Sequence, residues 1–239
     1  MKAVRGAEIS TSTMNYKKFA ACSKEELQAK LSEMTDERIF AVYAALKKGV
    51  TVDEVFEATK IDRWFLNKFK NLIAYENRLA SEKLTRELYE EGKRLGYLDK
   101  DIAALSGQKV PYRKKAAYKM VDTCAAEFPA KTPYFYSTFD PAEHDEAKSF
   151  LKNSDKKKRI VVIGSGPIRI GQGIEFDYSS VHCVWTLKEL GYEVAIINNN
   201  PETVSTDFDT ADRLYFEPLT PEDVQHVLDI EKPYGVIIT

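Results

Sequence analysis

A glycine-rich loop follows a short apolar segment in the stretch VVIGSGPIRIGQGIEFDY, residues 161–178. A strand that runs into such a loop is typical of phosphate-binding βα units, because backbone N–H groups at the start of the next helix can hold an anion. A dinucleotide site needs the spacing G-x-G-x-x-G. Gly164 and Gly166 satisfy its first two positions, but Arg169 stands in the third. The spacing therefore counts against an NAD enzyme, which is one alternative function for this chain.

A P-loop is the second possibility for the same residues. Its pattern G-x-x-x-x-G-K-[ST] uses the lysine to neutralise the outer phosphates and the hydroxyl to bind magnesium. Gly166 and Gly171 have this spacing, yet Gln172 and Gly173 stand where the lysine and the hydroxyl are required. Neither common kind of nucleotide loop is predicted.

The charged side chains of the loop favour a different role. Arg169, Glu175 and Asp177 lie beside what should be the carboxyl end of a parallel strand, where ligands and passages collect in open α/β sheets. In the alternative interpretation, the glycines only form tight turns and Arg169 pairs with one of the two acids.

The histidines offer little further chemistry. His144, His182 and His226 are separated from one another and from the cysteines, so they predict neither a metal site nor a catalytic triad. We predict no catalytic, cofactor-binding or metal-binding residue in this chain.

The elements that must position the loop have a βαβ pattern from residue 159 onward. Its apolar runs suit parallel strands, most of them covered on both faces. These runs are residues 160–164, 193–198, 213–216 and 235–239. Helices are expected over residues 178–190 and from Thr220, which is followed by a proline and two acids. Because the last strand ends with the sequence, the pattern predicts an incomplete parallel α/β domain.

Residues 23–119 have the pattern of a bundle of short, highly charged helices. Ser23 with Glu26, and Thr51 with Glu54, form two capping boxes. Apolar residues at helical spacing are expected to face the core. They include Ile39, Val42, Leu46, Phe65, Phe69, Leu72 and Ile73.

The end of this helical half has an alternative interpretation as a helix-turn-helix. A helix at 101–105 would meet Ser106 and Gly107, and a second helix would carry a basic face. That face consists of Arg113, Lys114, Lys115 and Lys119. The simpler interpretation is a helical hairpin with a solvated basic face. A helical interaction or DNA-binding module is thus the alternative function from another class.

Residues 121–140 contain two prolines and several aromatic residues without a helical period, so an extended segment over a neighbouring surface is expected. Its expected anchors are Phe128, Tyr134, Phe135 and Tyr136. A polar connector then leads to the first strand at residue 159.

Bulk composition bounds the possible functions. The chain has 239 residues, 44% of them hydrophobic, and a net charge of -2, so it can bury a core and has no overall preference for nucleic acid or anionic membranes. No apolar run is long enough to span a membrane, and the first residues lack the apolar region of a signal peptide. Three widely spaced cysteines, Cys22, Cys124 and Cys183, suit buried thiols in a reducing compartment. The expected location is the cytoplasm.

Several long motifs together resemble one family. GPIRIGQGIEFDYSSVH and NPETVSTDFDTADRLYFEP are similar to the large subunit of carbamoyl phosphate synthetase, at the start of the second of its two synthetase halves. IDRWFL, VDTCAAEF, YFYSTF and KAVRGAEI extend the resemblance over essentially the whole chain. Met120 departs from it, because the family usually has arginine there. The resemblance implies a tail of the first ATP-grasp region (1–9), a helical oligomerisation domain (10–120), an extended strap (121–156) and the first part of a biotin-carboxylase-like pre-ATP-grasp α/β domain (157–239).

The resemblance also implies a function. The family is an ATP-dependent ligase that makes carbamoyl phosphate from bicarbonate, ammonia from glutamine and ATP, for pyrimidine and arginine synthesis. ATP, magnesium and potassium bind in ATP-grasp domains, so this chain is expected to be inactive alone. The implied partners are the rest of the large subunit, a glutaminase small subunit and further copies through the helical domain. The implied residues lining a carbamate tunnel are Arg169, Gly173, Glu175 and Glu202.

Overall fold

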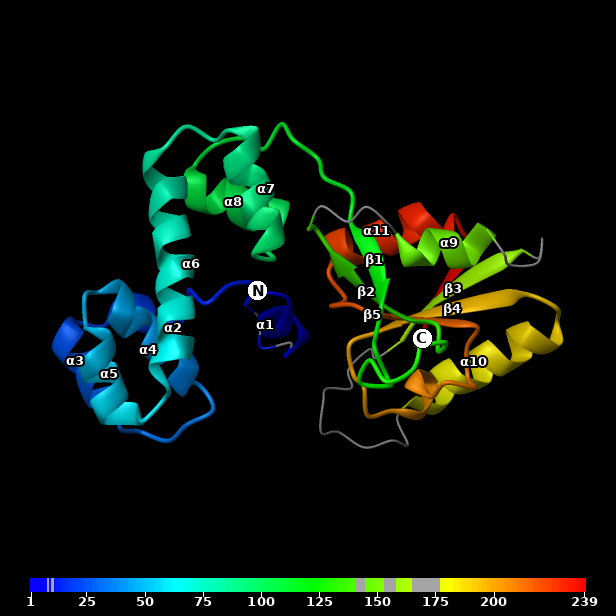
Figure 1. Ribbon diagram of the computed structural model, residues 1–239, viewed down its shortest axis with the longest axis horizontal. Helices are drawn as coiled ribbons and strands as arrows, with labels where there is room; N and C mark the ends of the chain where they lie inside the picture. Colours follow the sequence, from blue (N-terminus) through cyan, green and yellow to red (C-terminus); the bar gives the residue numbers. More distant parts are fainter. Residues whose placement is uncertain (8, 10, 141–144, 153–157, 165–176) are drawn as a thin grey trace. The chain divides into compact units, whose positions relative to one another are not determined.

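The structure is a computed structural model of residues 1–239, and it describes all of them except 8, 10, 141–144, 153–157 and 165–176. The chain forms two compact units (Figure 1). One is helical and comprises Met1 and Ile9–Arg113. The other is an α/β unit that comprises Lys2–Glu8 and Lys114–Thr239. From Lys2 the chain therefore contributes to the α/β unit, then forms the helical unit and returns at Lys114. Helices with an α/β sheet are the fold class predicted from the sequence, which is confirmed.

The helical unit is built from short capped helices. They are α2 (Lys17–Ala20), α3 (Lys24–Lys30), α4 (Arg38–Lys47), α5 (Val52–Thr59), α6 (Arg63–Ser81), α7 (Arg86–Arg94) and α8 (Asp99–Ser106). Both predicted capping boxes are present, at the starts of α3 and α5. Gly49, after α4, has a φ of 86°, a left-handed conformation that glycine adopts without strain.

One hydrophobic cluster of the helical unit gathers around the second half of α6 and the helices that follow it. Its buried members are Tyr75, Leu79, Leu84, Leu88, Tyr89, Tyr97 and Ile102. Two residues expected in the core lie elsewhere: Ile39 is 44% exposed and Phe65 is 55% exposed. Both residues do lie on helices, as the apolar spacing predicts. That spacing does not determine which of the apolar residues on a helix face pack against a neighbouring helix.

The α/β unit contains a mixed sheet with the strand order β1-β2-β5-β4-β3-β6 within the described residues. Its strands are β1 (Ala117–Met120), β2 (Tyr134–Thr138), β3 (Arg159–Ile163), β4 (Glu193–Asn198), β5 (Arg213–Phe216) and β6 (Gly235–Ile238). β1 pairs with β2 in antiparallel register, and every other pair is parallel. The four predicted strands correspond to β3, β4, β5 and β6.

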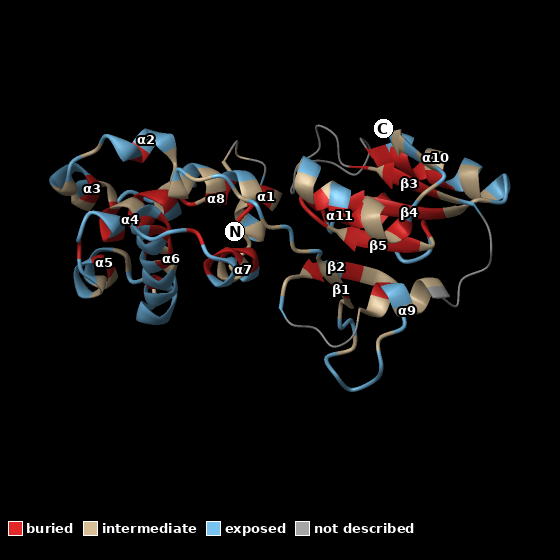
Figure 2. Ribbon diagram, turned by 90° about the horizontal axis from the view of Figure 1, so that it is seen from above, coloured by how far each residue is buried: buried red, intermediate tan, exposed pale blue. Residues whose placement is uncertain are grey.

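Helices cover both faces of this sheet (Figure 1). α10 (Tyr178–Glu189) packs on one face, whereas α9 (Glu146–Lys152) and α11 (Pro221–Glu231) lie on the other. Ile160 and Val162 of β3 pack with the α10 side, and Val161 packs with the opposite side. This alternation explains why the central strands are apolar throughout, and Figure 2 shows them buried.

One interpretation of the region before β3 was wrong. Residues 117–120, expected at the end of a helix, form strand β1, because Tyr118 is fully buried and its ring stacks edge-on against Tyr215 at 5.1 Å between centroids. Pro111 also disfavours helix in the residue before it. The helix expected to present the basic face is therefore absent from this described segment, and the DNA-binding alternative loses its structural basis.

The segment expected to run extended, residues 121–140, contains strand β2, and helix α9 forms within the polar connector that follows it. Phe135 is fully buried and anchors β2 as expected, whereas Phe128 is 69% exposed and Tyr136 is 41% exposed. The cysteines, expected to be buried, are each partly exposed and free. No helix within the described ranges is long and apolar enough to cross a membrane.

The amino ends of the sheet strands are held by a buried ion network. Arg213 donates to Glu231 at 2.7 and 3.0 Å and also pairs with Glu193, while the Tyr215 hydroxyl donates to Glu231 at 2.5 Å. Burial opposes the charge of Arg213, but the hydrogen bonds and attraction of Glu231 and Glu193 outweigh it and raise the pKa of the guanidinium. This network joins the end of α11 to the starts of β4 and β5.

Candidate functional site

The carboxyl ends of β3, β4 and β6 form one continuous edge, because these strands are parallel. The Gly164 backbone N–H donates to the Ile197 carbonyl at 3.0 Å, and the Thr239 N–H donates to the Ile163 carbonyl at 3.3 Å. The Thr239 and Ser180 hydroxyls lie 2.7 Å apart and hold the first turn of α10 against this edge. Backbone pairing therefore continues one residue beyond both β3 and β6.

The turn after β4 supplies a ladder of buried amide and hydroxyl groups. The Asn198 side-chain amide donates to the Ser205 hydroxyl at 3.0 Å, and its oxygen accepts from the Asn200 N–H at 2.9 Å. The Thr203 hydroxyl lies 3.1 Å from that of Ser205. These four side chains are each at most 5% exposed. A run of polar residues after a buried strand is accommodated here because the side chains satisfy one another.

Asp177, the residue before α10, closes this ladder from the other side. One carboxylate oxygen accepts from the Ser205 N–H at 2.8 Å. The other oxygen has no hydrogen-bond partner among the described residues, and neither does the side-chain nitrogen of Asn200. Both residues are 1% exposed. Buried polar atoms without partners are costly, so these two atoms are an unsatisfied acceptor and donor in the described part of this edge.

A short helix at the start of the chain, α1 (Lys2–Gly6), joins the same edge. The Asn199 side chain donates to the Gly6 carbonyl at 3.0 Å. The Lys2 ammonium donates to Glu217, just after β5, at 2.9 Å, and Ser137 donates to Glu217 from its N–H and its hydroxyl. Burial raises the pKa of the Glu217 carboxyl above its usual value, although the attraction of Lys2 opposes this.

A second ion pair holds α1 to α11. The Arg5 guanidinium donates to Asp223 at 3.2 and 3.3 Å, and both side chains are almost fully buried. The first residues of the chain are thus fixed to the α/β unit by two buried carboxylates, Glu217 and Asp223.

The predicted tunnel residues are tested only in part by this geometry. Arg169, Gly173 and Glu175 lie outside the described residues. Glu202 is exposed in the turn after β4, where its N–H donates to the Asn200 side-chain oxygen at 3.0 Å. The roles of all four stay predictions.

Sequence reasoning missed most of the polar ladder. Asn198 and Asn200 were counted only as the absence of a ribose-binding acid, and Asp177 was considered as a partner of Arg169. The signal was present in NNNPETVST, seven polar residues in nine directly after the apolar run VAII. Two histidines make ring contacts. His226 lies edge-on to Phe139, and His182 lies between the rings of Tyr178 and Trp185 on α10. His144 lies outside the described residues.

The chemistry available at the described edge is hydrogen bonding. Its groups are mainly amides, hydroxyls and backbone N–H groups, and no cluster able to hold a metal ion occurs among the residues that the structure describes. Such an edge can position or guide a small polar molecule.

Two family matches account for most of the chain. Residues 1–121 match the family described as the carbamoyl-phosphate synthetase large chain, oligomerisation domain. Residues 156–239 match the carbamoyl phosphate synthase preATP-grasp domain. The chain belongs to the carbamoyl phosphate synthetase large-chain family. The helical unit corresponds mainly to the first match and the sheet from β3 to the second.

Curated carbamoyl phosphate synthase large chains agree with this assignment. The relative from Lachnoclostridium phytofermentans is 49% identical over 247 residues, which cover 100% of this chain and 23% of that protein. Those from Agathobacter rectalis and Caldanaerobacter subterraneus subsp. tengcongensis are 47% and 46% identical, and each is covered to 22% of its length. The chain thus spans less than a quarter of the large chains that it matches.

Proposed function

We propose that this chain supplies part of a carbamoyl phosphate synthetase large subunit: the tail of the first ATP-grasp region, the oligomerisation domain, the strap and the start of the second synthetase half. The observation that carries the proposal is the order of the two matches, oligomerisation domain and then preATP-grasp domain, in a chain that aligns over its whole length with large chains at 46–49% identity.

In the proposed reaction, the first half uses ATP to convert bicarbonate into carboxyphosphate, and ammonia released from glutamine displaces phosphate to give carbamate. The second half transfers the terminal phosphoryl group of another ATP to a carbamate oxygen, which yields carbamoyl phosphate and ADP. ATP, magnesium and potassium would bind in ATP-grasp domains of the longer protein, in the cytoplasm. Its products would enter pyrimidine and arginine synthesis.

Within that enzyme, we propose that the carboxyl edge forms part of the wall along which carbamate passes. The buried ladder of Asn198, Asn200 and Ser205 supports this, because its hydrogen bonds fix the turn after β4 at this edge and it contains no strong nucleophile. Arg169, Gly173, Glu175 and Glu202 would line the passage, with glycine leaving room and charged groups satisfying one another.

The helical unit offers a surface for the proposed self-association. Trp64 and Phe65 at the start of α6 are 60% and 55% exposed, and their rings stack edge-on with centroids 5.0 Å apart. Exposed aromatic pairs of this kind are typical centres of protein interfaces. Replacing both with serine should lower the oligomer mass of the large subunit in sedimentation velocity, whereas an unchanged mass would remove this surface from the proposal.

Two experiments test the function itself. Purified residues 1–239 should not hydrolyse ATP with bicarbonate or carbamate, and hydrolysis would overturn the domain assignment. In a full-length large subunit that carries this segment, Gly173→Phe should uncouple glutamine hydrolysis from carbamoyl phosphate formation, because a phenyl ring would obstruct the passage. The partial reactions of each half should persist.

A further inference from the structure

Helix α1 belongs to different parts of the protein by sequence and by structure. Its residues, Lys2–Gly6, fall within the match to the oligomerisation domain, yet they form part of the α/β unit. The Lys2 ammonium donates to the Ser137 hydroxyl at 2.9 Å, across 135 residues of sequence. A helix of five residues is too short to be stable by itself in water, so α1 depends on its contacts with the α/β unit.

The contacts of α1 include charged side chains that are unfavourable to bury unless they are paired. Arg5 is 7% exposed and Asp223 is 4% exposed, and two N–H groups of the guanidinium donate to the two carboxylate oxygens at 3.2 and 3.3 Å. Such a two-point pair fixes orientation as well as distance, and removal of one partner leaves the other charge buried. The α/β unit therefore holds α1 in a defined position.

The end of α1 is linked to the turn after β4. The Asn199 side chain donates to the Gly6 carbonyl at 3.0 Å, and Gly6 directly follows Arg5. The side-chain oxygen of Asn200, the next residue, accepts from the Glu202 N–H at 3.0 Å. Two hydrogen bonds and adjacent backbone thus connect Arg5 to Glu202, one of the four residues proposed to line the passage.

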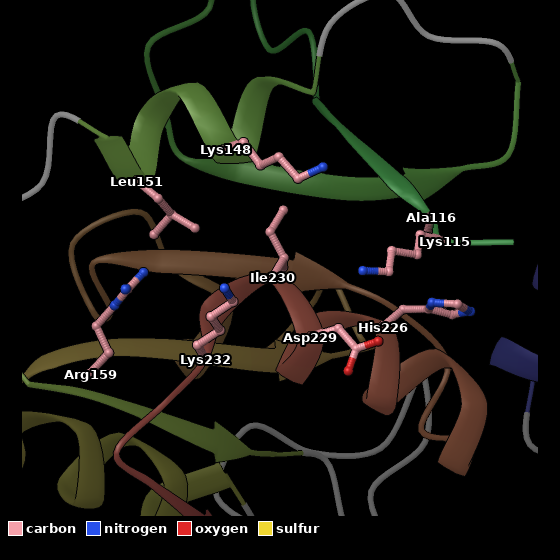
Figure 3. Close-up of a pocket in the computed structure, with 9 residues that line it drawn as sticks. All are labelled: Lys115, Ala116, Lys148, Leu151, Arg159, His226, Asp229, Ile230 and Lys232. Atoms are coloured by element: carbon pink, nitrogen blue, oxygen red, sulfur yellow. The ribbon is translucent and has the colours of Figure 1, made fainter.

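Helix α11 depends on the same ion pair for the position of its first turn. A groove of about 390 Å³ lies along one side of α11, between it and α9 (Figure 3). The residues that α11 contributes to the groove are His226, Asp229 and Ile230. Ion pairs hold the two ends of the helix, Asp223 with Arg5 and Glu231 with Arg213. Because the groove leaves room beside α11, loss of the Arg5 pair should free its first turn.

We propose that α1 is a brace between the first synthetase half and the proposed passage, with Arg5 as its positioning residue. This role rests on the proposed function, in which residues 1–9 are the tail of the first ATP-grasp region. Through Asp223 and Asn199, α1 holds the turn after β4, and with it Glu202, in place. A change of position in the first half would then reach the passage directly through α1. Arg5 acts through the turn and not on the substrate.

Hydrogen exchange in the 239-residue chain tests the brace without any activity. Arg5→Met keeps a side chain of similar length but removes its charge. We expect exchange of the Asn200 and Glu202 amides to accelerate at least about twofold in this variant. The control is Arg86→Met on α7, where the arginine is 62% exposed in a surface ion pair, and it should leave both rates unchanged. Unchanged rates in Arg5→Met would overturn the brace.

A double variant separates the brace from folding. Arg5→Met alone leaves Asp223 buried without its cation, which lowers stability. Arg5→Met with Asp223→Asn removes both charges, and asparagine keeps an oxygen that can accept from the Thr220 hydroxyl. We expect the double variant to unfold in urea near the midpoint of the unmodified chain, with exchange still accelerated at Asn200 and Glu202 but not in the centre of β4. Normal exchange at this turn in the double variant would overturn the brace.

The functional role is tested in a full-length large subunit with its glutaminase partner. Arg5→Met and the double variant should raise the ratio of glutamine hydrolysed to carbamoyl phosphate formed at least about twofold. Arg5→Lys, which keeps the charge, should raise it less. Phosphoryl transfer from carbamoyl phosphate to ADP, which reverses the second half's step and gives carbamate and ATP, should persist in all three variants. Its loss in the double variant would indicate a general structural role and overturn the brace.

Gly173→Phe distinguishes failure of the brace from failure of the passage. If Gly173→Phe raises the ratio and the Arg5 variants do not, the brace alone is overturned. If neither raises it, the passage is overturned and the brace with it. A raised ratio in Gly173→Phe and in both charge-removing variants, with a smaller rise in Arg5→Lys, is the result that we expect.

Discussion

The two edges of the same sheet are built from different chemistry. At the amino edge, the first residues of β3, β4 and β5 are all charged: Arg159, Glu193 and Arg213. At the carboxyl edge, the residues around the ends of β3, β4 and β6 are mainly glycine, asparagine, serine and threonine, bonded by amides and hydroxyls. Helix α1 adds its lysine and arginine there through Glu217 and Asp223.

This difference has a physical consequence. Ion pairs at the amino edge resist removal of either partner, because a buried charge is left behind. Hydrogen bonds between neutral groups, such as those of Asn198 at the carboxyl edge, each contribute less. The amino edge therefore depends mainly on ion pairs, whereas the edge around the ends of β3, β4 and β6 depends mainly on hydrogen bonds between polar groups.

The largest expected effect comes from breaking the amino-edge network. Arg213→Met should lower the free energy of unfolding of the α/β unit by about 3–5 kcal/mol, because Glu231 is fully buried and would lose its main partner. Unfolding in urea can be followed by Trp185 fluorescence in a Trp64→Phe background, since the chain has two tryptophans. Arg159→Met is the matched control. Its side chain is 27% exposed, so its loss should stay under about 1 kcal/mol. Equal losses would contradict the network.

A smaller effect is expected at the carboxyl edge. Asp177→Ala should cost about 1–3 kcal/mol, because the Ser205 N–H would lose its acceptor in a buried site. Asp177→Asn keeps an oxygen acceptor and should lose less than half as much in the same urea experiment. If the asparagine variant were as unstable as the alanine variant, charge and not hydrogen bonding would govern this edge.

Glu217 should make stability depend on pH. Its folded pKa is raised above its ordinary value of 4.5, so the folded state binds more protons than the unfolded state in the window between the two. The free energy of unfolding should therefore fall as pH rises from about 4.5 through the folded pKa, by at most about 1.4 kcal/mol per pH unit. Lys2→Met should extend this fall to higher pH. Urea midpoints across the range check it, and an unchanged slope in Glu217→Gln would refute the assignment.

The smallest effect is expected at Gly164. A Cβ atom there would lie 3.4 Å from the Asn198 side-chain nitrogen and 3.5 Å from the Ser180 hydroxyl, which are ordinary contacts. Gly164→Ala should therefore change the free energy of unfolding by less than about 0.5 kcal/mol. A larger loss, measured by the same fluorescence, would mean that the added methyl group makes closer contacts than these distances indicate.

Sequence reasoning located the strands and caps well, because their causes are local. β3 and β4 are short runs of branched apolar residues, and the boxes at Ser23 and Thr51 need only three residues of separation. β1 was missed because its identity comes from pairing with β2 and from the buried ring of Tyr118, contacts that no local pattern records. Tertiary pairing overrode the helical tendency of that segment.

The two edges were predictable to different degrees. The carboxyl edge was identified from the glycine loop, but its hydrogen-bonded ladder was not, since it depends on Asp177 meeting Ser205 across 28 residues. The buried ion network at the amino edge was not predicted at all. Arg213 and Glu231 are 18 residues apart, and their pairing exists only in the folded unit.

The ratio of glutamine hydrolysed to carbamoyl phosphate formed, measured in a full-length large subunit with its glutaminase partner, tests the passage most directly. We expect Gly173→Phe to raise this ratio several-fold while bicarbonate-dependent ATP hydrolysis persists, and Gly173→Ala to leave it near the unmodified value, because a methyl group occupies far less space than a phenyl ring. An unchanged ratio in Gly173→Phe would contradict a passage at the carboxyl edge.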